Sequence, residues 1–134
     1  MTPGHLLRTL LLIAAAMLFF VGCGGGSASP APTTHPVSGK LLSKAGRPVT
    51  EGSIEFVTIG PTPVRATADV SADGSFSLTT MTADGKKYPG AEVGDYKVTW
   101  YPVMKSESQS EVPVALRGTQ KIVAGSNELN LKLP

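Results

Sequence analysis

The stretch "VRATADVSADGSFSLTT", residues Val64–Thr80, alternates small or apolar side chains with polar ones on both sides of an Asp73-Gly74 pair. Alternation with a period of two is typical of a β-strand with one face in the core and one in water. Asp-Gly between two alternating runs is a strong hairpin signal, because these residue types accept the backbone angles of a tight turn. The stretch therefore predicts two strands joined by a tight turn, residues 64–70 and 75–80.

Most of the chain after residue 36 repeats this alternation. Five further segments fit β-strands: residues 37–42, 52–59, 95–101, 119–123 and 128–134. In the third of these, Tyr96, Val98 and Trp100 share one face and are expected in the core. The 15 Gly and 11 Pro residues favour short elements joined by turns. About seven strands with regular turns, and no window with a helical period, predict an all-β fold, a single β-sandwich.

Glycine and proline mark the connections between the expected strands. Ala45-Gly46 predicts a turn between the first two strands. Gly60–Pro63 ends the second strand, because proline cannot donate a hydrogen bond to a strand ladder. Residues 84–94 and 104–118 are expected to be loops, and the second is expected to be the longest irregular connection.

The N-terminus carries a different pattern. Leu10–Val21 is an uninterrupted apolar run of 12 residues behind a weakly positive start that contains Arg8. A helix of that length rises about 18 Å, against roughly 30 Å of bilayer hydrocarbon, so the run is too short to span a membrane comfortably. The positive start, the short apolar run and the small Gly22 predict a signal peptide over residues 1–22. The alternative is a core helix, which would have to be apolar on every face.

The residues that follow make this prediction more specific. "FVGC", Phe20–Cys23, resembles the lipobox of bacterial lipoproteins, with Phe in place of the usual Leu at its start. The resemblance implies that the Cys23 sulfur receives a diacylglyceryl group, that cleavage follows Gly22, and that the new N-terminus is acylated. Two or more acyl chains hold a protein firmly at a membrane. We therefore interpret the chain's only cysteine as a lipid anchor; a catalytic nucleophile or a metal ligand would need partners that the neighbouring sequence lacks.

Residues 24–36 have the composition of a linker. They include no large apolar side chain, and a flexible Gly/Ser part precedes a stiffer Pro part. The expected parts of the chain are a signal peptide (1–22), a lipidated Cys23 with its tether (23–36) and a β-sandwich domain (37–134). The whole chain has 12 basic and 10 acidic residues. This near-balance argues against nucleic acid as a partner, because it leaves no basic footprint.

Four segments of the expected domain resemble one family. They are "VSGKLLSKAGRPVTEGSIEFV" (37–57), "ATADVSADGSFSLTT" (66–80), "YPGAEVGDYKVTW" (88–100) and "IVAGSNELNLKL" (122–133). Together they are similar to the carboxypeptidase regulatory-like domain. The resemblance implies an Ig-like sandwich of the transthyretin-like (prealbumin-like) type and no catalytic residues. It also implies an origin in planctomycete-type bacteria, where small lipoproteins with this domain are abundant.

Few side chains are available for catalysis. Downstream of the predicted cleavage site the only histidine is His35, in the expected tether, where no core would position it. A Ser-His-Asp triad or a zinc site therefore lacks its essential residues. The sequence predicts a non-enzymatic protein with no catalytic residue, no metal site and no cofactor.

Two binding functions remain as alternatives. Asp69, Asp73 and Asp84 lie in or near turns, but the D-x-D-x-D-G spacing of a calcium loop and its terminal Glu are absent. Asp73 is therefore interpreted as a residue that favours its turn. Related sandwiches bind sugars through exposed aromatic side chains, and the candidate ligand-binding residues of this kind are Tyr88 and Tyr101.

These observations predict an extracytoplasmic lipoprotein anchored in a bacterial membrane, at the outer membrane or cell surface rather than the inner membrane. Its domain would act as a structural or interaction module of the cell envelope. The membrane itself and an envelope protein or a glycan are the expected partners. The alternative is a carbohydrate- or calcium-binding surface module, which would need a ligand site on the sandwich.

Overall fold

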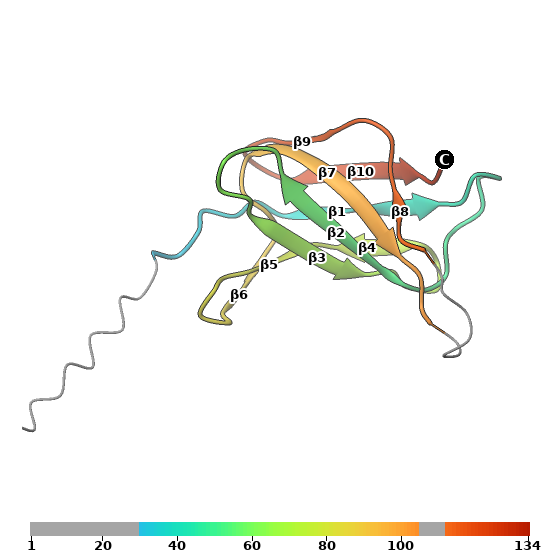
Figure 1. Ribbon diagram of the computed structural model, residues 1–134, viewed down its shortest axis with the longest axis horizontal. Coiled ribbons are helices and arrows are strands. Elements are labelled where there is room, and N and C mark those ends of the chain that lie inside the picture. The colour runs from blue at the N-terminus through green and yellow to red at the C-terminus, as the bar shows by residue number, and fades with distance from the viewer. Residues whose placement is uncertain (1–29, 105–111) are drawn as a thin grey trace, which may run out of the picture.

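The computed structural model describes residues 30–104 and 112–134, and this part of the chain contains ten β-strands and no helix. A three-stranded and a seven-stranded sheet form a β-sandwich (Figure 1). The predicted signal peptide, Cys23 and the start of the predicted tether lie outside the described residues. The strands are β1 (Val37–Leu42), β2 (Ser53–Thr58), β3 (Arg65–Asp69), β4 (Ser75–Ser77), β5 (Thr79–Met81), β6 (Lys87–Pro89), β7 (Gly94–Tyr101), β8 (Val114–Ala115), β9 (Gln120–Ile122) and β10 (Asn127–Lys132).

The two sheets divide the strands without following their order in the chain. The small sheet has the order β10-β1-β4, and the large sheet has the order β6-β5-β3-β2-β7-β8, with β9 also paired to β7. β2 lies between β3 and β7 and pairs antiparallel with both. β1 and β10 pair in parallel along their whole length (Figure 1). The last strand of the chain is therefore held by the first.

The predicted strand 75–80 is in fact two strands that belong to different sheets. β4 pairs with β1 in the small sheet, and β5 pairs with β3 and β6 in the large sheet. The chain crosses between them at Leu78, whose N–H donates to the Val37 carbonyl (2.9 Å) and whose carbonyl accepts from the Gly90 N–H (2.7 Å). The alternation survives the crossing because both sheets face the same core. Phe76, Leu78 and Thr80 are accordingly all buried.

Three turns of the chain share one geometry. In each, the carbonyl of a Ser or Thr accepts a hydrogen bond from the N–H of a glycine three residues later. The N–H of the same Ser or Thr donates to the carbonyl of the residue that follows the glycine. The glycines have φ angles of 79°, 80° and 80°, in the left-handed region that favours glycine. The turns cover residues 43–47, 71–75 and 82–86.

The expected turn at Asp73-Gly74 is confirmed, but the hairpin expected around it is wrong. Its flanking strands, β3 and β4, lie in different sheets, so this turn carries the chain from one sheet to the other. The turn at Ala45-Gly46 likewise leads the chain back beside β1, where Leu42 bridges Pro48, rather than pairing β1 with β2. The turn residues thus predicted where the chain reverses direction, but not which strands pair on either side of the turn.

Two of the expected loops contain short strands. β6 lies within residues 84–94 and pairs with β5, and β8 lies within residues 104–118 and pairs with β7. Runs of two or three residues are too short for an alternating pattern to stand out from a polar loop. These strands, together with the division of 75–80, raise the count from the expected seven or so to ten.

The core lies between the sheets and draws on both. Its largest fully buried side chains include Tyr96, Phe56, Leu41 and Ile54. The Phe56 ring packs against Phe76 and Tyr96, with ring centroids 6.1 and 6.0 Å apart, which joins the large sheet to the small one. Trp100, also expected in the core, is half-buried and packs against its rim.

Candidate functional site

Tyr101 lies at the end of β7 on the outer face of the large sheet, and 38% of it is exposed. Its hydroxyl donates to Glu55 Oε1 (3.2 Å), and Arg65 Nη1 lies 3.3 Å from the other oxygen of the same carboxylate. Partial burial of the ring, and then the nearby Glu55 charge, raise the pKa of Tyr101 above its ordinary value. An aromatic ring, a carboxylate and a guanidinium thus share one exposed patch.

Tyr88 lies elsewhere, so the structure does not bring the two predicted ligand-binding tyrosines together. In β6 it stands opposite the buried Thr80, and residues directly opposite in an antiparallel pair share a face of the sheet. Tyr88 therefore faces inward at the sheet edge and is half-buried, while Tyr101 faces outward. Strands β5, β3 and β2 also separate the two strands, which at about 4.8 Å per step places them about 19 Å apart. They cannot form one aromatic platform.

The three aspartates considered for calcium are dispersed. Asp69 lies in β3, whereas Asp73 and Asp84 lie in two different turns. Asp73 Oδ1 accepts hydrogen bonds from the N–H (3.0 Å) and hydroxyl (2.6 Å) of Ser75, which lower the pKa of its carboxyl and confirm its role as a turn residue. Hydrogen bonds from Thr82 and Lys86 lower the pKa of Asp84 in the same way. Within residues 30–104 and 112–134, no three His, Cys, Asp or Glu side chains gather closely enough to hold a metal ion.

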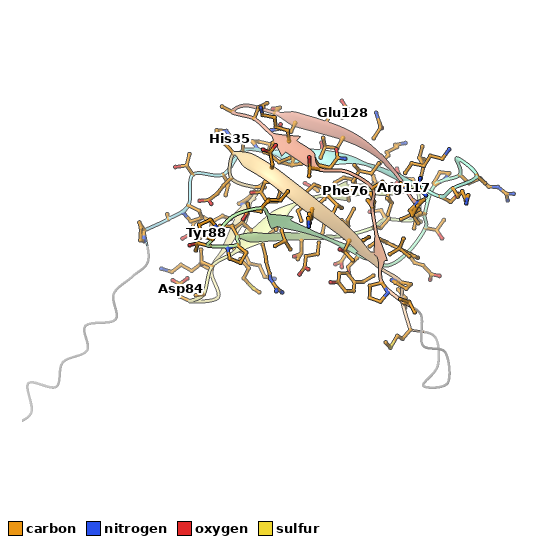
Figure 2. All side chains as sticks on the ribbon, turned by 45° about the horizontal axis from the view of Figure 1, so that its top comes forward. His35, Phe76, Asp84, Tyr88, Arg117 and Glu128 are labelled. Atoms are coloured by element: carbon orange, nitrogen blue, oxygen red, sulfur yellow. The ribbon has the colours of Figure 1, made fainter. Side chains whose placement is uncertain are left out.

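His35 is fixed to the domain, although the sequence placed it in the tether without support. Its backbone exchanges two hydrogen bonds with Ala91, at 2.8 and 3.0 Å, and its Nδ1 accepts from the Gly125 N–H at 3.1 Å. Gly90 makes this possible, because a Cβ at that position would collide with the His35 carbonyl. Figure 2 shows His35 at the end of the sandwich where the chain enters, with Tyr88 and Asp84 at the same end. The ordered domain therefore begins before Val37.

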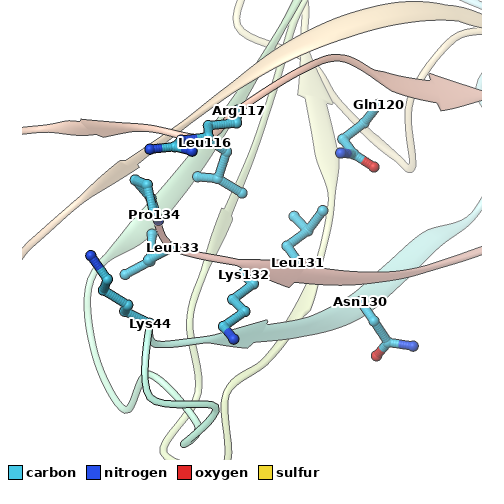
Figure 3. A pocket seen from close by; sticks show the side chains of 9 residues that line it. All are labelled: Lys44, Leu116, Arg117, Gln120, Asn130, Leu131, Lys132, Leu133 and Pro134. Atoms are coloured by element: carbon cyan, nitrogen blue, oxygen red, sulfur yellow. The ribbon is translucent and has the colours of Figure 1, made fainter.

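A groove of about 540 Å³ lies beside the C-terminal part of β10, between that strand and the segment linking β8 to β9 (Figure 3). Leu116, Leu131 and Leu133 supply its apolar part, and Lys44, Arg117 and Lys132 supply positive charge. Among the described residues, no acidic side chain lines it. The sequence does not predict this groove, because its walls come from segments that only the fold brings together.

Comparison with known proteins adds no family. No protein-family model matches the chain, and no curated protein matches it significantly. Among the described residues, no helix has the length and apolar character needed to cross a membrane. The apolar run Leu10–Val21 is not among those residues.

Proposed function

We propose that this chain is a bacterial lipoprotein, anchored through Cys23 at the outer membrane or cell surface, whose β-sandwich is a non-enzymatic structural or interaction module. The observation that carries the proposal is the sequence Phe20–Cys23, which follows a short apolar run and precedes a Gly/Ser/Pro segment. A cysteine in that position is suited to lipidation, and acyl chains attach a folded domain without a spanning helix. The carboxypeptidase regulatory-like type is proposed for the domain on the four segments that resemble it.

The point where the chain joins the domain limits the length of the proposed tether. The chain reaches the domain at His35, which is bonded to Ala91 and Gly125. Between Cys23 and His35 lie 11 residues, 24–34, which at about 3.3–3.6 Å per residue span at most roughly 40 Å. The tethered domain would therefore stay close to the membrane surface.

Replacing the cysteine tests the anchor. The wild-type chain should enter the detergent phase when membranes are extracted and phase-separated. The test variant carries an ordinary secretory signal in place of residues 1–22 and the substitution Cys23→Ser, which removes the sulfur. This variant should appear in the aqueous phase. Ser27→Ala, which alters the tether alone, is the matched control and should behave as wild type. Full retention of the Cys23→Ser chain in the detergent phase would refute the lipid anchor.

Carbohydrate binding is retained as a second candidate function because Tyr101 is exposed beside Glu55 and Arg65 on the outer face of the large sheet. An aromatic face flanked by charged hydrogen-bonding groups can stack on a sugar ring and hold its hydroxyls. If this patch binds an oligosaccharide, Tyr101→Ala should weaken the affinity about tenfold through the lost stacking. Tyr88→Phe, on the inner side of the edge strand, should leave it unchanged. Titration of a glycan array with both variants checks this, and equal effects of the two substitutions would exclude the patch.

A further inference from the structure

Strand β10 leaves one side of its backbone unpaired at the edge of the small sheet. Within residues 30–104 and 112–134, its strand partner is β1 alone. On the side that faces β1, the N–H groups of Asn127 and Leu133 donate to the carbonyls of Pro36 and Leu42, both at 2.9 Å. Backbone groups of successive residues in a strand point in opposite directions within the sheet. The backbone N–H and carbonyl groups of the alternate residues therefore point to the open side: Glu128, Asn130 and Lys132, which we call the β10 edge.

The β10 edge borders apolar surface that the domain does not fully cover. Leu129 and Leu133 of the same segment are only half-buried, and so is Leu116 across the groove. Figure 3 shows Leu116, Leu131 and Leu133 turned toward the space between the two segments. An unpaired strand beside incompletely buried leucines is a site that another strand can occupy.

The side chains of the β10 edge are complementary to themselves. Glu128 and Lys132 lie two residues on either side of Asn130, and all three are exposed. If two copies of β10 pair antiparallel about a two-fold axis at Asn130, each Glu128 stands opposite Lys132 of the second copy. Opposite charges in directly opposed positions stabilise a strand pair, and like charges destabilise it. Among registers that bring the β10 edges together, only this one pairs both charges with their opposites.

We propose that two copies of this chain associate through their β10 edges, which joins the two small sheets into one six-stranded sheet with the order β4-β1-β10-β10-β1-β4. A two-fold axis lets each surface meet its own copy, as in most homodimers. The second copy supplies partners for the backbone groups of the β10 edge and covers the half-buried leucines beside it. The pairing uses no residue of the lipid anchor, so either proposal can fail without the other.

A charge exchange tests the register. The full-length chain, with its own anchor, is purified in density-matched detergent and its mass is measured by sedimentation. The wild type should be a dimer, and Glu128→Lys or Lys132→Glu, each of which creates two like-charge pairs, should weaken dimerisation about tenfold. The double variant Glu128→Lys/Lys132→Glu restores opposite charges and should restore the dimer. A wild type that stays monomeric, or a double variant no better than the single ones, would overturn the proposal.

A disulfide test measures the same pairing on the chain without its lipid anchor. In a Cys23→Ser background, Asn130→Cys places two thiols at the two-fold axis, where Cα atoms of an opposed pair lie about 5.5 Å apart, within disulfide range. Mild oxidation should cross-link this variant into dimers. Lys40→Cys, exposed on β1 beside the same strand, is the matched control. It should cross-link far less, and equal cross-linking of the two variants would contradict the pairing.

Discussion

Replacing Phe76 with alanine is expected to lower the free energy of unfolding by about 3–5 kcal/mol, the range for large buried aromatic side chains. Phe76 is 4% exposed and packs its ring against Phe56 across the sandwich. It stands on β4, a three-residue edge strand that has little else to hold it in the core. Its loss removes an aromatic contact between the sheets and leaves a cavity that the short strand cannot readily close.

Chemical denaturation of the wild type and the variant measures this loss. Domains of this size are stable by only about 5–15 kcal/mol, so Phe76→Ala should shift the unfolding midpoint strongly. Ser77→Ala, at the next and exposed position of the same strand, is the control and should change stability by no more than about 0.5 kcal/mol. A loss as small as that for Phe76→Ala would mean that the inward face of β4 is wrongly assigned.

Gly39→Ala is expected to lower the free energy of unfolding by about 3 kcal/mol, although it adds a single methyl group. Gly39 lies in the middle of β1, between Leu129 of β10 and Phe76 of β4. A Cβ at this position would collide with the Leu129 carbonyl and would come within 2.8 Å of the Phe76 ring. The carbonyl belongs to the strand backbone, so relief requires β10 to move.

A second variant separates the collision of the added methyl group with the Leu129 carbonyl from its contact with the Phe76 ring. In a Phe76→Leu background the ring is gone, yet Gly39→Ala should remain strongly destabilising because the Leu129 carbonyl is still in the way. Ser38→Ala, exposed one residue earlier on β1, should be nearly neutral. If Gly39→Ala were also neutral in thermal denaturation, the parallel pairing of β1 with β10 would be wrong.

Sequence alternation predicted the inward faces well because burial follows a period of two within each strand. Phe76, Leu78, Tyr96 and Val98 are all buried as expected. The same alternation could not reveal that residues 75–80 change sheets, since inward positions in both sheets point into one core. Assigning a strand to a sheet requires long-range pairing, such as that of Leu78 with Val37 and Gly90.

Features that depend on the close approach of distant segments could not be predicted from the sequence. Gly39 and Gly90 look like ordinary strand and loop glycines until Leu129 and His35 are brought against them. The separation of Tyr88 from Tyr101 likewise follows from strand order, which no local pattern encodes. Exposure of Tyr101, at the polar end of an alternating strand, is the part of the candidate site that the sequence did predict.

The mass of the mature N-terminal peptide decides whether Cys23 carries the lipid anchor. The full chain is produced in a bacterium that processes lipoproteins, extracted from membranes and digested, and its first peptide is measured by mass spectrometry. We expect a peptide that begins at Cys23 and carries the added mass of a diacylglyceryl group and an N-terminal acyl chain. A first peptide that begins elsewhere, or a Cys23 whose thiol is free to react with maleimide, would contradict it.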